Sequence, residues 1–188
     1  SRGELIGHLN SDEQYLPGAL SRVEAYFRDN PATDVLFADA IITNADGSYR
    51  FHRRIQTPFL WHTRTRPLST LTCSMFFRRR LIDELGMFFD TQWRNIGDGE
   101  WMVRLLEQRP RMAELREFTS VFAHTGKNLS LNARAHEEFA RFRAAAPRWM
   151  RAGTPAALAW LWARRFAVGG YSSKPFDYQI FKIGRAHV

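Results

Sequence analysis

Residues 3–20 read GELIGHLNSDEQYLPGAL, and this stretch decides the fold class. The apolar run 4–9 predicts a buried strand, and the four polar residues 10–13 end it. Leu16-Pro17-Gly18 then predicts the start of a helix, because proline suits a first helical turn. A buried strand that leads through a polar turn into a helix is the unit of an α/β sheet. Ligands of such sheets bind beyond the carboxyl ends of the strands.

The same alternation continues along the chain. Apolar or extended runs predict strands at 34–43, 48–52, 71–77, 112–115 and 118–122. Asn44-Ala-Asp-Gly47 is typical of a hairpin turn, and the stretch 53–70 has no clear period and predicts a loop. Helices are predicted at 16–29, with Leu20, Val23 and Phe27 inward, and at 78–85, 98–108, 135–146 and 155–167. The sequence therefore predicts an α/β fold with helices added at its C-terminal end.

The composition and the distribution of charge exclude some classes of function and some kinds of site. The 188 residues are 45% hydrophobic and carry a formal net charge of +8. Residues 1–132 hold 17 basic and 16 acidic side chains, whereas residues 133–188 hold 10 and 3. A protein that coats nucleic acid with its whole surface would not leave two thirds of itself neutral. The single cysteine, Cys73, excludes a disulfide and a cysteine-based zinc site within the chain, and we expect it in the core.

Three polar clusters follow apolar runs or open helices, and each has two interpretations. Asp12 and Glu13 could aim at one hard cation, or could be acids that complement the dipole of the next helix. Asp98 could be a general base, or an N-cap. His124 could ligate a metal or bind phosphate, or could be an ordinary satisfied histidine. Spacing alone leaves these alternatives open.

Taken in order, these pieces resemble the family 2 glycosyltransferases, the inverting GT-A type. Residues 3–20 look like the strand, DxD-type motif and helix of that family, and residues 30–47 look like its next strand and hairpin. Residues 74–90 resemble its acceptor-side stretch, and the sequence DGEWMVRL at 98–105 resembles the helix that begins with its catalytic base. The resemblance spans about residues 3–132 and implies the C-terminal part of a GT-A, Rossmann-like fold with a mixed sheet.

The resemblance also implies roles for single residues. Asp98 matches the general base, and Asp12 matches the position that contacts the nucleotide-sugar end, directly or through an ion. Glu13 matches the position that binds the divalent cation, Mn²⁺ or Mg²⁺, with Asp12 and His124 as further metal ligands. Asp39 matches an acidic position near the acceptor cleft, with its role left open. Glu13 departs from the commoner Asp, and Gly97 and Ala123 depart from an acidic and a basic position.

The function implied is inverting transfer of a sugar from a UDP-, GDP- or dTDP-sugar to a hydroxyl of a glycan or lipid-linked acceptor, in cell-surface or polysaccharide biosynthesis. The expected location is the cytoplasm, peripherally at the inner face of the cell membrane, and no nucleic-acid partner is expected. Two alternatives remain: an inactive glycosyltransferase-like binding or scaffold domain, and a nucleic-acid-binding module that uses the basic C-terminal part.

The expected organisation has three parts. Residues 1–132 form a glycosyltransferase domain that lacks its N-terminal nucleotide-binding portion, 133–182 form a basic helical appendage, and 183–188 are a non-native tail. The stretch 141–166 interleaves arginine with tryptophan and other apolar residues. That composition suits the face of an anionic membrane, and it also suits a helix pair packed on the catalytic domain with its arginine stems reaching solvent.

Overall fold

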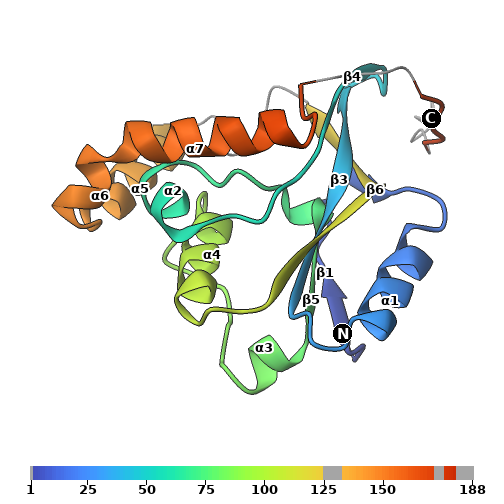
Figure 1. The fold of residues 1–188 in the computed structure, drawn as a ribbon, viewed down its shortest axis with the longest axis horizontal. Coiled ribbons are helices and arrows are strands. Elements are labelled where there is room, and N and C mark those ends of the chain that lie inside the picture. Colours follow the sequence, from blue (N-terminus) through green and yellow to red (C-terminus); the bar gives the residue numbers. More distant parts are fainter. Residues whose placement is uncertain (1, 125–132, 172–175, 181–188) are drawn as a thin grey trace, which may run out of the picture.

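The computed structural model describes residues 2–124, 133–171 and 176–180. Its centre is one mixed sheet that pairs β1 (Leu5–Gly7), β5 (Met75–Arg78), β3 (Val35–Asn44), β6 (Met112–His124) and β2 (Glu13–Tyr15) in that order. β4 (Tyr49–Arg53) pairs with β3 outside this path. Figure 1 shows the long, twisted β3 and β6 crossing the molecule, with helices on both sides. The predicted α/β class is confirmed.

The directions of the strands place the carboxyl ends of three of them at one edge of the sheet. β3 and β6 are parallel, whereas β1–β5 and β5–β3 are antiparallel pairs. Two successive antiparallel pairings make β1 run in the same direction as β3. The carboxyl ends of β1, β3 and β6 therefore lie at the same edge, which is where ligands of α/β sheets bind.

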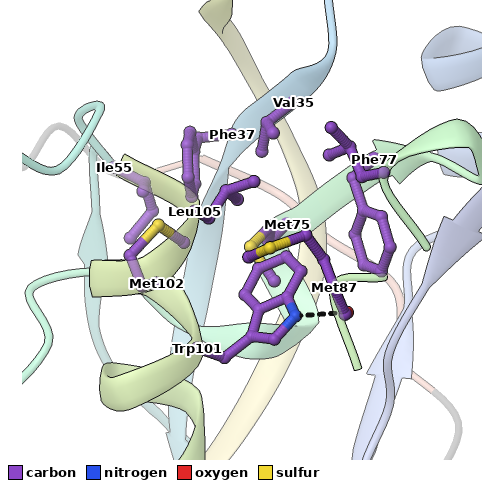
Figure 2. Close-up of a cluster of buried hydrophobic side chains, with 10 residues drawn as sticks. Val35, Phe37, Ile55, Met75, Phe77, Met87, Trp101, Met102 and Leu105 are labelled. Carbon is purple, nitrogen blue, oxygen red and sulfur yellow. Dashed lines mark hydrogen bonds between the residues drawn. The ribbon is translucent and has the colours of Figure 1, made fainter. Parts of the chain in front are cut away.

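Helices cover the sheet with two apolar layers. α1 (Ala19–Asp29) packs Val23 and Phe27 against one face. On the other side, α4 (Gly97–Glu107) contributes Trp101, Met102 and Leu105 to the main cluster (Figure 2). Trp101 also donates its indole N–H to the carbonyl of Met87 at 2.7 Å. This bond satisfies the one polar atom of the largest fully buried side chain.

Short helices before and after β5, and a set of C-terminal helices, add to this core. α3 (Arg80–Asp83) follows β5, and the one-turn η1 (Thr72–Ser74) precedes it and buries Cys73. The C-terminal helices are α5 (Ala133–Ala144), α6 (Arg148–Ala152) and α7 (Thr154–Ala167). The predicted tail 183–188 lies outside the described residues.

The structure corrects the sequence prediction in several places. The stretch 53–70 is not all loop, because α2 (Leu60–Thr65) forms inside it and packs between α4 and α7. No strand was predicted between the polar residues 10–13 and Leu16, but Glu13–Tyr15 form β2 at the edge beside β6. Leu20 is 55% exposed, and Ala19 takes the inward position beside Val23 and Phe27.

A bulge explains why the sequence predicted two strands where the structure has the single strand β6. β3 pairs Ala38 with Leu115 and Asp39 with Phe118, so that Arg116 and Glu117 have no opposite partner on β3. The extra residues interrupt the alternation of buried and exposed side chains that predicts a continuous strand. The bulge also directs the Arg116 guanidinium to the buried carboxylate of Asp39 at 3.1 Å.

Candidate functional site

A cavity of about 1220 Å³ lies at the edge where β1, β3 and β6 end. Its lining comes from the loop after β1, from β4, from α2 and the segment after it, from residues 89–99, from the end of β6, and from α5. Six aromatic side chains contribute: Phe51, Phe89, Trp93, Phe122, Phe139 and Phe142. Aromatic walls with a few convergent polar groups are typical of small-molecule sites.

The acidic loop after β1 contributes only in part. Asn10, Ser11 and Asp12 line the cavity. Glu13 does not belong to the lining, because it begins β2 and its carboxylate accepts a hydrogen bond from the backbone N–H of Asn10 at 2.8 Å. That carboxylate lies beside the buried Cys73 thiol. Burial raises the pKa of Glu13. Of the predicted pair, Asp12 faces the cavity and Glu13 braces the loop behind it.

Asp98 lines the cavity from the first turn of α4. The N-cap of this helix is Ile96, so Asp98 is not the N-cap that its position suggested. Its Oδ1 accepts the backbone N–H of Gly99 at 2.8 Å. Burial raises the pKa of Asp98, and the backbone N–H groups and His8 oppose that rise. A half-buried carboxylate with a raised pKa in a cleft is a candidate proton acceptor.

His124 ends β6 and lines the same cavity, with Asn44 as its partner on β3. The rest of its predicted cluster, Thr125 to Lys127, lies outside the described residues. Asp12, Asp98 and His124 therefore meet at one cavity, although they lie far apart in the sequence. Across residues 2–124, 133–171 and 176–180, no group of three or more His, Cys, Asp or Glu side chains could hold a metal ion.

Sequence reasoning missed His8. It lines the cavity just beyond β1 and packs edge-on against Phe89 at 6.1 Å between ring centroids. Burial raises the pKa of both Glu13 and Asp98, and His8 opposes that rise in each. His8 is the histidine that links the acidic loop to the Asp98 side of the cavity. No local signal in the sequence indicated it, because His8 lies inside the predicted strand 4–9, whereas the observed β1 ends at Gly7.

Sequence reasoning also missed the wall built by α5. The Glu138 carboxylate accepts the backbone N–H of Asn95 at 2.9 Å and its side-chain amide at 3.0 Å, and these bonds lower the pKa of Glu138. Arg141 stacks over the ring of Trp93 at 4.4 Å. These contacts fix the segment that leads into Asp98, so a helix of the predicted appendage completes the cavity.

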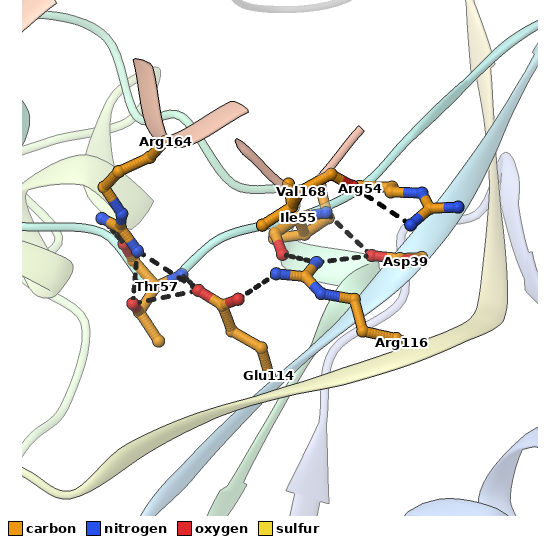
Figure 3. A network of polar contacts seen from close by, with 8 residues as sticks. All are labelled: Asp39, Arg54, Ile55, Thr57, Glu114, Arg116, Arg164 and Val168. Carbon is orange, nitrogen blue, oxygen red and sulfur yellow. Dashed lines mark hydrogen bonds and ion pairs between the residues drawn. The ribbon is translucent and has the colours of Figure 1, made fainter. Parts of the chain in front are cut away.

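Asp39 lies elsewhere. It is 3% exposed and accepts the backbone N–H of Ile55 at 2.9 Å as well as the Arg116 guanidinium. Figure 3 shows how Arg116 continues to Glu114, and Glu114 to Arg164 of α7. Arg164 also donates to the carbonyl and hydroxyl oxygens of Thr57. Asp39 is thus part of a network that fastens α7 to the sheet, and it does not line the cavity.

Comparison with known proteins finds similarity in structure alone. No protein-family model and no curated protein sequence matches the chain. The fold is similar to Staphylococcus aureus TarS, a glycosyltransferase: the structure of TarS 1–349 in complex with UDP-GlcNAc matches with a TM-score of 0.54 and 15% identity over 89% of this chain and 50% of that one. Another structure of TarS 1–349 matches at a TM-score of 0.50 with 15% identity, covering 89% of this chain and 48% of that one.

The match to a longer TarS structure has a TM-score of 0.50 with 14% identity and covers 89% of this chain and 29% of that one. The chain thus spans half or less of the TarS chains that it matches. At this identity the likeness concerns the fold, which is that of a Rossmann-like glycosyltransferase domain. The predicted fold class is confirmed.

Proposed function

We propose that this protein is an inverting glycosyltransferase of the family 2, GT-A type. Such an enzyme moves a sugar from a nucleoside diphosphate sugar to a hydroxyl acceptor. One observation carries the proposal: Asp12 and Asp98 line a single cavity at the carboxyl edge of a sheet with a glycosyltransferase fold. TarS has been crystallised with UDP-GlcNAc, which supports a nucleotide sugar as the class of donor. UDP-, GDP- and dTDP-sugars are the donors to test.

Asp98 would act as the general base. A carboxylate whose pKa is raised by burial binds a proton more readily, and in its ionised form it can take the proton of an acceptor hydroxyl. The oxygen would then attack the anomeric carbon as the bond to the diphosphate breaks, and the configuration would invert in this single displacement. His8 lies near Asp98 and opposes the rise in the pKa of Asp98 that burial causes.

A divalent cation, Mn²⁺ or Mg²⁺, fits this site only together with the donor. Asp12 is the described carboxylate of the acidic loop that faces the cavity, and His124 lies on the lining. These two residues are too few for a cation cage made of protein alone, whereas Mg²⁺ is commonly held by one or two carboxylates plus substrate phosphates. When bound there, the ion would supply positive charge beside the diphosphate leaving group.

The acceptor side of the proposal rests on the aromatic lining. Phe89 and Trp93 line the cavity in the segment before Asp98, and aromatic side chains of this kind can pack against a sugar. We propose a glycan or a lipid-linked acceptor, in cell-surface or polysaccharide biosynthesis, and action in the cytoplasm at the inner face of the membrane. No helix in the described part of the chain is long and apolar enough to span a membrane.

The test is donor turnover by the protein, both as this chain and in any longer chain that contains it. Release of nucleoside diphosphate from each donor is measured with Mn²⁺ or Mg²⁺, with and without acceptor. Asp98→Asn should lower kcat by about 10²- to 10⁴-fold while donor binding measured by calorimetry is unchanged. Asp83→Asn, an exposed Asp on α3, is the matched control and should keep wild-type turnover. Normal kcat in Asp98→Asn would remove Asp98 from this role.

Dependence on pH gives a second readout. Because Asp98 must be ionised to accept a proton, kcat/KM should rise with pH through a midpoint above the ordinary carboxyl range. Nucleotide-sugar binding without turnover in every chain tested would instead support the inactive binding or scaffold domain.

A further inference from the structure

The outer face of α7 carries no charge. All the exposed residues of this helix are apolar, namely Pro155, Ala156, Ala159, Trp160, Trp162, Ala163, Phe166 and Ala167. The three aromatic side chains among them are 59%, 56% and 79% exposed. A helix that packs one side on a protein normally presents charged or polar residues on the other. An exposed apolar surface of this kind marks an interaction site.

The inner face of the same helix packs against the rest of the protein. The apolar outer face is therefore a second surface of α7 and is not the one that contacts the core. Ala157 and Leu161 are buried against the protein, and Arg164 is bonded to Thr57 and Glu114 (Figure 3). Figure 1 shows α7 at the periphery of the molecule, with α2 between it and α4. The apolar residues therefore face outward in a helix whose orientation is fixed.

The charged residues in the sequence around α7 are all basic. The sequence holds no Asp or Glu from 139 to 176 but seven basic residues in that span. Two of them are engaged, Arg141 over Trp93 and Arg164 in the network with Glu114. Within the described residues, four others form no ion pair with a carboxylate: Arg143, Arg148, Arg151 and Arg165. Trp149 of α6, 62% exposed, adds a further aromatic side chain beside Arg148.

We propose that the outer face of α7 docks on an anionic lipid bilayer. Its tryptophan and phenylalanine side chains enter the boundary between headgroups and acyl chains, where such rings are favoured. Arg148 and Arg151 of α6, which contacts α7, meet the anionic headgroups, and basic residues near such a surface add to binding. A second copy of this chain would bring positive charge against positive charge, which disfavours that occupant. The proposal does not depend on sugar transfer, since neither α7 nor Trp149 lines the cavity.

The experiment is vesicle flotation of the chain, without donor or metal. Vesicles of phosphatidylcholine alone are compared with vesicles that also contain phosphatidylglycerol, at low and high salt. The protein should float with the anionic vesicles, and binding should weaken as salt screens the arginines. Quenching of tryptophan fluorescence by brominated acyl chains should accompany binding, because Trp160 and Trp162 enter the bilayer.

Two sets of variants locate the contact. The triple variant Trp160→Ser, Trp162→Ser, Phe166→Ser should bind anionic vesicles at least ~10-fold more weakly, because three exposed rings are removed without touching the core. Leu20→Ser with Leu85→Ser removes two exposed apolar side chains of α1 and of the turn after α3, and should bind like the wild type. Circular dichroism verifies that both variants are folded.

Three outcomes would overturn the proposal. The first is a wild-type chain that does not bind anionic vesicles even at low salt. The second is a triple variant that binds as tightly as the wild type. The third is a wild-type dimer in solution that the triple variant abolishes while vesicle binding is absent, which would assign the face to a second copy of the chain.

Discussion

Asp39 makes the stability of this protein depend on pH in a way that can be calculated. Its carboxylate is buried between β3 and Arg116, and burial raises its pKa from the ordinary 3.8 to about 6, although Arg116 and the N–H of Ile55 oppose that rise. The folded protein therefore holds this proton more tightly than the unfolded chain. Below the unfolded pKa both states are protonated, and above the folded pKa neither is.

The sign follows from proton binding. Between the two pKa values the folded state keeps a proton that the unfolded state has lost, so the free energy of unfolding falls as pH rises. A shift from 3.8 to about 6 corresponds to ~3 kcal/mol in total, and to ~2 kcal/mol between about pH 4.5 and about pH 7.5. Asp39→Asn cannot ionise and lacks this dependence. Relative to the wild type, the variant should gain ~2 kcal/mol over that interval.

The assay is urea unfolding of both proteins at several pH values, followed by circular dichroism. The quantity of interest is the difference between the two free energies of unfolding, because any constant cost of the Asn side chain cancels in its change with pH. Asp29→Asn, whose side chain is 68% exposed, is the control and should show a nearly constant difference. If the Asp39→Asn protein instead loses stability relative to the wild type as pH rises, pairing with Arg116 outweighs burial and the reasoning is wrong.

Two further predictions concern packing. Gly153→Ala should destabilise the protein by about 1–3 kcal/mol in urea unfolding, because a Cβ at this position would lie 2.1 Å from a ring carbon of Trp61; an unchanged midpoint would show that the ring can move aside. Cys73 is fully buried and burial raises the pKa of its thiol, so a thiol reagent at mildly alkaline pH should label it only after unfolding; rapid labelling of the folded protein would place it at the surface.

Local pattern was sufficient where neighbours in sequence set the structure. The apolar run before Asn10 predicted β1, the Asn44–Gly47 turn predicted the hairpin of β3 and β4, and the helix that begins near Asp98 was placed within one residue. The sequence predicted a break between two strands at Arg116 and Glu117, because a bulge disrupts the two-residue period of a continuous strand. α2 was missed because its residues show no helical period of apolar side chains and gain their support from α4 and α7.

The candidate site likewise has features that local sequence predicts and features that depend on the folded chain. The α/β class and the candidate chemical groups follow from the sequence alone, since Asp12, Asp98 and His124 each follow a local signal. The folded chain was needed to show that these three share a cavity, that Glu13 lies outside its lining and that Asp39 belongs to a separate network. It was also needed to show that Glu138 holds Asn95, and that eight apolar residues of α7 face outward. Residue type and spacing act over a few positions, whereas strand direction and helix docking join groups that are tens of residues apart.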